Sequence, residues 1–296
     1  MAIVNGQPHV PEFTDYQYYL PGGYQCPGCG GLMATKMALQ VIFEESPNAI
    51  VFGGSCGSGR SKVRPTALGV RAGGAVALSA AAAIRGIQRP VIVIGGEGQT
   101  FDMGLDDLSG AFMSGHPFMI LVMDNQSYAS SGGHRTGTTE LFARTKMHLN
   151  GVRTPKKHPA VMMAYSGARF VATASLFYYK DYIRKLKLAL THMPSLLQIY
   201  TPCIPSHESD PKDSANMSRL AVQTGLFPLF EYLDGTFTRS TIPHRHVREY
   251  LKVVGNLQHL SDEEVEHLEQ HAQEVNGMVD DLVATSATTK HPTEAM

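Results

Sequence analysis

The sequence predicts a three-layer α/β domain built on a mostly parallel sheet, with a helical C-terminal extension. Short apolar runs alternate along the chain with stretches of helical periodicity, which is the pattern of repeated β–α–β units. Two of these runs, residues 91–94 and 118–123, are uninterrupted, as expected of strands buried on both faces of a parallel sheet. Hydrophobic residues make up 43% of the 296 residues and charged residues only 17%, which is typical of a well-buried globular chain.

The individual elements follow from the period of the apolar residues. Helices are expected over residues 32–45, 71–84, 105–114, 159–166, 179–192, 217–223, 246–254 and 262–282. Strands are expected over residues 49–53, 91–94, 118–123, 169–174 and 195–200. The last helix follows Ser261-x-x-Glu264, the pattern of a capping box, in which each side chain accepts a backbone N–H of the other residue.

The domain organisation follows from the same elements. Residues 1–20 are expected to form an N-terminal arm that packs on a partner, and residues 21–205 the α/β domain. Residues 206–284 are expected to form a partly helical C-terminal extension. Residues 285–296 contain few apolar side chains and are expected to be disordered.

Composition excludes several classes of protein. The net charge of −1 does not favour binding to nucleic acid or to an anionic membrane. The first thirteen residues lack the basic and apolar segments of a signal peptide. The longest uncharged run, residues 72–84, is too short and too rich in glycine and alanine to span a membrane. We therefore expect a cytoplasmic protein without membrane insertion.

Two polar side chains mark the ends of the central strands. Glu97 follows residues 91–94 within a glycine-rich turn, where the backbone can turn sharply and approach a ligand. Asn125 follows residues 118–123, about one β–α–β unit later. A parallel unit places both at the edge where open α/β sheets bind ligands. Carboxylate and amide oxygens suit Mg²⁺ that also binds phosphates, so a magnesium-bridged diphosphate site is predicted, with an ordinary glycine turn as the alternative.

The cysteines form a second candidate site. The chain has four: Cys26, Cys29, Cys56 and Cys203. Disulfides are not expected without a secretion signal. Structural zinc favours a second close-spaced pair, which Cys56 and Cys203 do not form. A [4Fe–4S] cluster takes four thiolates and tolerates dispersed ligands. Spacing alone leaves a cluster, zinc, a redox pair and unliganded thiols open.

Both sites resemble those of one family. Glu97 and Asn125 resemble the thiamine-diphosphate motif, Gly-Asp-Gly followed further on by Asn. The run from Asp124 to Tyr128, with the later Ser-Gly-Gly of residues 131–133, resembles the β subunit of 2-oxoacid:ferredoxin oxidoreductases, the pyruvate:ferredoxin oxidoreductase type. The resemblance covers residues 24–268. One departure is Glu97, where the family has Asp. The extra methylene keeps the charge but moves the carboxylate oxygens outward, which affects the metal geometry.

The resemblance implies a thiamine-diphosphate-binding fold and three cofactors: thiamine diphosphate, Mg²⁺ and one [4Fe–4S] cluster. The implied Mg²⁺ ligands are Glu97, Asn125 and the backbone carbonyl of Ser127. The implied cofactor-binding residues are Gly54, Ser55, Cys56, Gly96, Glu97, Gly98, Gln99, Thr100, Asn125, Ser127, Tyr128 and Ala129. The implied cluster ligands are Cys26, Cys29, Cys56 and Cys203, so that every cysteine has a role.

The resemblance also implies an activity. The expected reaction is oxidative decarboxylation of a 2-oxoacid, such as pyruvate or the aryl 2-oxoacid phenylglyoxylate, usually to acyl-CoA and CO₂. Electrons are expected to pass to ferredoxin or another carrier. The expected partners are an α subunit, which supplies the activating glutamate, and γ and ferredoxin-like δ subunits, so that the chain alone is inactive. Because Glu97 replaces Asp, the alternative of a non-catalytic Cys₄ metal-binding or electron-transfer subunit stays open.

Several charged residues allow weaker hypotheses. His134 and Arg135 follow the Asn125 motif and are candidate contacts for the substrate carboxylate, with a loop-stabilising role as the alternative. Residues 156–158, Lys-Lys-His between two prolines, are expected to form a solvated turn and not an anion site. His244 and His246 are two residues apart, so on a helix they would point to different faces.

Overall fold

An eight-stranded sheet organises the molecule. The computed structural model describes residues 3–4, 7–8, 25–53, 66–68 and 89–288, and its strand order is β10-β9-β7-β8-β6-β5-β3-β4. Six neighbouring strands are parallel: β3 (Ile50–Gly53), β4 (Thr66–Leu68), β5 (Val91–Gly96), β6 (Phe118–Asp124), β7 (Phe170–Ser175) and β8 (Ser195–Tyr200). A separate two-stranded sheet pairs β1 (Ile3–Val4) with β2 (Gln7–Pro8). The predicted mostly parallel α/β fold is confirmed.

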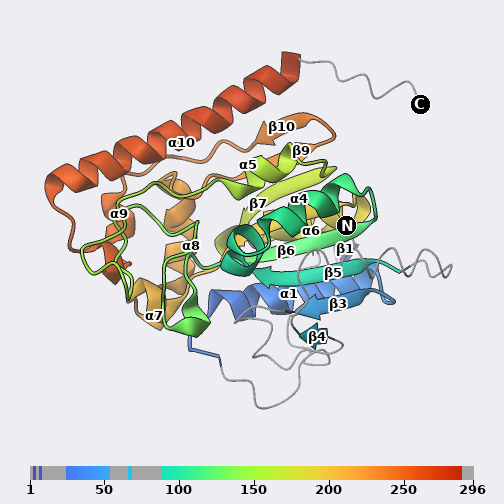
Figure 1. The fold of residues 1–296 in the computed structure, drawn as a ribbon, viewed down its shortest axis with the longest axis horizontal. Coiled ribbons are helices and arrows are strands. Elements are labelled where there is room, and N and C mark those ends of the chain that lie inside the picture. Colours follow the sequence, from blue (N-terminus) through green and yellow to red (C-terminus); the bar gives the residue numbers. More distant parts are fainter. Residues whose placement is uncertain (1–2, 5–6, 9–24, 54–65, 69–88, 289–296) are drawn as a thin grey trace.

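Helices cover both faces of the sheet, which makes three layers (Figure 1). One face carries α1 (Gly30–Glu45) and α6 (Tyr179–Thr191), which share an apolar core with the strands. The other face carries α4 (Leu105–Met113) and α5 (Pro159–Ala164), whose core reaches the long helix α10 (Asp262–Thr288). Burial of β5 to β8 on both faces explains why their sequences are continuous apolar runs.

The sequence did not predict the hairpin β9 (Phe230–Leu233) and β10 (Thr236–Arg239), which extends the sheet in the antiparallel sense next to β7. Its turn is Asp234-Gly235, with φ of +42° and +101°. An Asp-Gly pair favours these left-handed conformations, so this pair was the available signal. The hairpin lies within the expected C-terminal extension, yet it belongs to the main sheet.

The remaining C-terminal elements form a third apolar core. They are α7 (Ile204–His207), α8 (Ser214–Gln223) and α9 (Arg248–Leu251). The helix expected over residues 246–254 is confined to α9, followed by the 3₁₀ turn Gly255–Leu257. The capping box is confirmed, because Ser261 N–H donates to Glu264 Oε2 over 3.1 Å and Glu264 N–H donates to Ser261 Oγ over 3.2 Å. Helix α10 runs to Thr288, past the predicted end at residue 282.

Other turns complete the chain. A π-helical turn spans Gly98–Asp102, and 3₁₀ turns span Ala129–Ser131, Leu176–Tyr178 and Pro211–Asp213. The helix expected over residues 71–84, most of the N-terminal arm, and the loop with Gly54, Ser55 and Cys56 lie outside the described residues. Within the described part of the chain, none of the helices combines the length and the apolar character needed to cross a bilayer.

Candidate functional site

The loops after β5 and β6 meet at the carboxyl edge of the sheet. The two strands are parallel neighbours, and Gly96 pairs with Met123 at their ends. Glu97 and Asn125 follow directly, so the register brings both side chains to the same edge. Ser127 N–H donates to Glu97 Oε1 over 2.7 Å and lies 3.1 Å from Asn125 Oδ1. Asn125 N–H lies 3.5 Å from Glu97 Oε2. The two expected ligands therefore surround one short backbone segment.

Burial dominates the electrostatics of Glu97. The residue is only 2% exposed. Burial raises the pKa of Glu97 well above its usual value, and the negative charge of Asp124 raises it further. The backbone N–H groups of Ser127 and Asn125 oppose this shift only in part. A buried carboxylate beside an amide oxygen is a donor pair that suits a divalent cation, because the cation would offset the charge of Glu97.

Asp124, the last residue of β6, holds the loop that follows it through hydrogen bonds. Its Oδ1 accepts the Gln126 N–H over 3.0 Å and the Thr138 hydroxyl over 2.8 Å. Its Oδ2 accepts the side-chain amide of Gln198, on β8, over 2.6 Å. Burial raises the pKa of Asp124, and these hydrogen bonds oppose the rise. The sequence analysis did not assign a role to Asp124 or Gln198, although Gln198 is the only amide within the apolar run of β8.

The turn after Glu97 packs against Tyr128. A Cβ atom placed on Gly98 would lie 2.3 Å from Tyr128 Cε1, so only glycine allows this contact. The Tyr128 hydroxyl lies 3.2 Å from both Gly98 O and Asp102 Oδ2. Thr100 Oγ1 donates to Gly96 O over 2.9 Å. Together with Gln99 and Ala129, which are half-buried, these expected cofactor-binding residues lie on the two loops that meet at Glu97.

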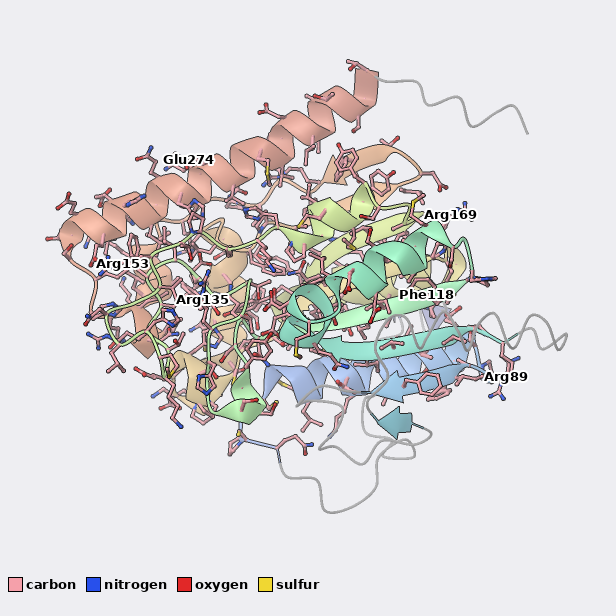
Figure 2. All side chains as sticks on the ribbon, viewed as in Figure 1. Arg89, Phe118, Arg135, Arg153, Arg169 and Glu274 are labelled. Atoms are coloured by element: carbon pink, nitrogen blue, oxygen red, sulfur yellow. The ribbon has the colours of Figure 1, made fainter. Side chains whose placement is uncertain are left out.

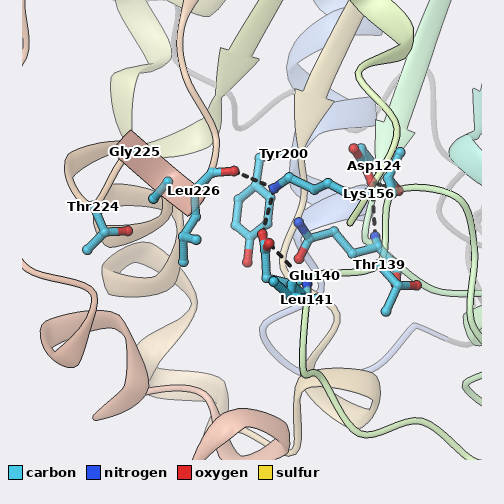
Figure 3. A network of polar contacts seen from close by, with 12 residues as sticks. Asp124, Thr139, Glu140, Leu141, Lys156, Tyr200, Thr224, Gly225 and Leu226 are labelled. Atoms are coloured by element: carbon cyan, nitrogen blue, oxygen red, sulfur yellow. Dashed lines mark hydrogen bonds and ion pairs between the residues drawn. The ribbon is translucent and has the colours of Figure 1, made fainter. Parts of the chain in front are cut away.

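The Lys156 turn differs in part from the prediction of a solvated turn. The Lys156 side chain is only 8% exposed, and its Nζ lies 2.5 Å from Glu140 Oε2. The same ammonium donates to the carbonyl of Leu226, as Figure 3 shows. Lys157 pairs with Asp102 over 2.8 Å, and its side chain is 42% exposed. Burial lowers the pKa of His158 to about 4. Lys156 is therefore buried beside the carboxylate of Glu140, while Lys157 stays at the surface as predicted.

The Cys26–Cys29 turn and the Cys203 turn adjoin each other. Gly30 N–H donates to Pro202 O over 3.0 Å, and Ser214 Oγ donates to Gly28 O over 2.8 Å. A Cβ atom on Gly30 would lie 2.6 Å from Pro202 Cδ. Cys29 Sγ caps helix α1 by accepting the Leu32 N–H over 3.4 Å. The backbone thus brings two of the expected ligand turns together.

The set of four cysteines extends beyond the residues that the structure describes. Cys26 is exposed and Cys56 lies outside the described residues. Among the residues that the structure does describe, no three His, Cys, Asp or Glu side chains are arranged to hold a metal ion. The fit to a cluster therefore depends on the adjoining Cys29 and Cys203 turns, and the four-ligand set stays a prediction.

His134 and Arg135 take part in the loop's own structure. The carbonyl of His134 accepts the N–H of Tyr128 over 2.9 Å and lies 3.3 Å from Ser127 Oγ. Arg135 Nη2 donates to Thr154 Oγ1 over 2.6 Å (Figure 2 labels Arg135 in this irregular region). These contacts are those of the loop-stabilising alternative, and a substrate contact stays a prediction.

Three further histidines lie outside the predicted sites. His244 and His246 do not lie on a helix, and both approach Glu269, at 2.7 Å and 3.8 Å. His207 was not singled out in the sequence. It is buried, its Nδ1 lies 3.0 Å from Cys203 O, and its Nε2 lies 3.4 Å from Gln126 Oε1. His207 therefore links the Cys203 turn to the loop after β6.

Comparison with known proteins gives consistent results. Residues 60–199 match the family described as thiamine pyrophosphate enzyme, C-terminal TPP binding domain. The chain is 31% identical over 291 residues to the pyruvate synthase subunit PorB of Methanocaldococcus jannaschii, covering 90% of this chain and 97% of that one. It is 35% identical to the ketoisovalerate oxidoreductase subunit VorB of Pyrococcus horikoshii, over 61% of this chain and 62% of that one.

A solved structure shares the fold. The 2-oxoglutarate:ferredoxin oxidoreductase from Magnetococcus marinus, determined with 2-oxoglutarate, coenzyme A and succinyl-CoA bound, superposes with a TM-score of 0.58. The alignment covers 85% of this chain and 94% of that one at 19% sequence identity. The two chains therefore share a fold over most of their lengths.

Proposed function

Because the chain belongs to the PorB and VorB family of β subunits of 2-oxoacid:ferredoxin oxidoreductases, we propose that it binds thiamine diphosphate, Mg²⁺ and one [4Fe–4S] cluster and oxidatively decarboxylates a 2-oxoacid. Pyruvate or an aryl 2-oxoacid such as phenylglyoxylate is the proposed substrate class, with acyl-CoA and CO₂ as the usual products. The observation that carries the proposal is the convergence of Glu97 and Asn125 on the Ser127 backbone.

The residues of the two loops have separable tasks in this proposal. Glu97, Asn125 and the Ser127 carbonyl would hold Mg²⁺, and the Ser127 carbonyl already accepts the Ala129 N–H over 2.7 Å. The turn from Gly96 to Thr100 would face the diphosphate, where its glycines let the backbone come close. When bound, thiamine diphosphate supplies the carbanion chemistry that 2-oxoacid decarboxylation requires. The chain contributes binding and orientation.

The cysteines have a second task. Cys26, Cys29, Cys56 and Cys203 are the proposed ligands of a [4Fe–4S] cluster, and the hydrogen bond between Gly30 and Pro202 supports this for two of their turns. The four thiolates would hold the cluster, which would supply one-electron transfer to ferredoxin or another carrier. Within the family, partner subunits are needed for activity, and an α subunit with γ and ferredoxin-like δ subunits is proposed here.

Anaerobic assembly of the complex tests the function. The expected result is one thiamine diphosphate, one Mg²⁺ and about four irons per chain, with 2-oxoacid-dependent and coenzyme A-dependent reduction of a viologen dye. Pyruvate, ketoisovalerate, 2-oxoglutarate and phenylglyoxylate would be compared as substrates, and the chain alone should show no turnover. Iron without bound thiamine and without 2-oxoacid-dependent reduction would instead identify a non-catalytic electron-transfer subunit. Turnover by the isolated chain would refute the need for partners.

A further inference from the structure

One carboxylate joins two loops next to the proposed cofactor site. Asp102 ends the π-helical turn Gly98–Asp102 that follows Glu97. Its Oδ2 lies 3.2 Å from the Tyr128 hydroxyl and accepts the Gly137 N–H over 2.9 Å. Its Oδ1 lies 2.8 Å from Lys157 Nζ. The loop after β5 therefore meets both the beginning and the end of the long connection between β6 and α5 at Asp102.

The packing at this junction leaves no space for larger residues. A Cβ atom on Gly137 would lie 2.4 Å from Asp102 Oδ1 and 2.8 Å from Lys157 Cδ. A Cβ atom on Gly98 would lie 2.3 Å from the Tyr128 ring. Backbone at two positions is thus in direct contact with the side chains that make the junction. Close contact of this kind indicates a fixed arrangement, because dense interiors adapt little to added atoms.

The hydrogen-bond donors of Tyr128 and Lys157 have acceptors at the junction. The Tyr128 phenol stays protonated at neutral pH, because burial and then the charge of Asp102 raise its pKa to about 12. It can therefore donate to Gly98 O or to Asp102, both 3.2 Å away. Lys157 Nζ donates to Phe101 O over 3.2 Å in addition to its ion pair. The side chains of Asp102 and Lys157 are 20% and 42% exposed, so their ion pair alone is screened.

The turn is held at both of its ends. At its start, Glu97 accepts the N–H of Ser127, and at its end Asp102 binds Tyr128, the next residue along the same loop. We propose that Asp102, with Tyr128 and Lys157, is a positioning residue that keeps the Gly98–Asp102 turn in the shape that receives the diphosphate. This inference rests on the proposed function. A turn that is ordered before binding loses less conformational freedom when the ligand arrives.

Three variants of the assembled complex test the inference: Asp102→Asn, Tyr128→Phe and Lys157→Met. Thiamine diphosphate would be titrated calorimetrically at saturating Mg²⁺, and the melting temperature would be measured without cofactor. We expect the Kd for thiamine diphosphate to rise by roughly tenfold in Asp102→Asn and by about three- to tenfold in the other two, since each loses one or two hydrogen bonds. At saturating cofactor, kcat of Asp102→Asn and Lys157→Met should stay within about twofold of the wild type, because the Mg²⁺ ligands are unchanged.

Lys187→Met is the matched control. Lys187 pairs with Glu45 through a side chain that is 47% exposed, but it lies on α6 on the opposite face of the sheet. The Kd of this variant complex for thiamine diphosphate should equal that of the wild type. If wild-type complex binds thiamine diphosphate and all three variants bind it equally well, the inference is wrong while the function stands. If the wild-type complex does not bind it, the proposed function itself fails. If Asp102→Asn does not fold, Tyr128→Phe and Lys157→Met decide the outcome.

Discussion

The carboxylate of Glu97 accepts a 2.7 Å hydrogen bond from the backbone N–H of Ser127, on the loop that follows the neighbouring strand. The contact fixes the position of that loop from the first residue after β5. It also leaves Glu97 Oε2 beside Asn125 N–H at 3.5 Å, a distance at which the hydrogen bond is weak. The Glu97 side chain thus braces the loop through Oε1, while its Oε2 makes only this weak contact with Asn125 N–H.

Glu97→Gln should separate the bracing of this loop from the proposed binding of Mg²⁺. The amide keeps an acceptor for Ser127 N–H but loses the negative charge, so Mg²⁺-dependent binding of thiamine diphosphate should weaken by more than about tenfold. Without Mg²⁺ at pH 8, the variant should melt at or above the wild-type temperature, because a buried charge is removed. Calorimetric titration and thermal melting in EDTA measure the two effects. Wild-type affinity in the variant would contradict the role of Glu97 as a ligand.

The stability of the metal-free chain should fall as pH rises above about 4, the region where unfolded carboxylates ionise. Glu97 and Asp124 have pKa values raised by burial, so the folded state keeps protons that the unfolded state has released. Their contribution is therefore greatest below the unfolded pKa and is lost as pH rises through the folded values. Urea unfolding from pH 5 to pH 8 measures the slope. Mg²⁺ should reduce it, and a slope equal in wild type and Glu97→Gln would refute the assignment to Glu97.

His207 should give a slope of the opposite sign. Burial lowers its pKa to about 4, so below about 6.5 the unfolded state binds a proton that the folded state does not. Its stabilising contribution is present above pH 6.5 and is lost as pH falls toward 4, at up to about 1.4 kcal/mol per pH unit. His207→Asn should remove this part of the slope in urea unfolding. An unchanged acid limb would show that His207 is protonated in the folded chain.

Gly30→Ala should disturb the cysteine turns. The added Cβ would lie 2.6 Å from both Pro202 N and Pro202 Cδ, so the Cys29 and Cys203 turns must separate. We expect a loss of about 1–3 kcal/mol in the free energy of unfolding and a reduced iron content of the anaerobically prepared complex. Gly277→Ala in α10 is the control, because its Cβ meets nothing within 4 Å. It should stabilise by about 0.5–1 kcal/mol and keep the iron. Full iron content in Gly30→Ala would argue against adjoining ligand turns.

Lys156→Met should destabilise the chain by about 3–5 kcal/mol, because it leaves Glu140 charged, buried and unpaired. The double variant Lys156→Met, Glu140→Leu should recover much of this loss, since no buried charge remains. Lys187→Met, which breaks an exposed pair, should change stability by less than about 1 kcal/mol. Guanidinium unfolding measures all three. A loss in Lys156→Met no larger than in Lys187→Met would mean that Lys156 is solvated after all.

Local patterns in the sequence were sufficient for the parallel part of the fold. The runs that form β5 and β6 are apolar at every position because both of their faces are covered, and a glycine-rich turn and an asparagine mark their ends. The capping box at Ser261 is likewise a local pattern, and it forms as predicted. By contrast, the hairpin β9–β10 was missed because its short, half-exposed strands carry a weak pattern, although Asp234-Gly235 was a usable signal.

The sequence by itself determined the sheet, its carboxyl edge and the placing of Glu97 and Asn125 there, because strand period and loop position depend on neighbours in the chain. Only the tertiary structure decided which charges are buried and what they bind. Lys156 is paired with Glu140, Asp102 joins the turn after β5 to the connection between β6 and α5, and His207 lies between the Cys203 turn and Gln126. These links join residues that are well separated along the chain, and their distances are set by tertiary packing. No local period along the chain encodes them.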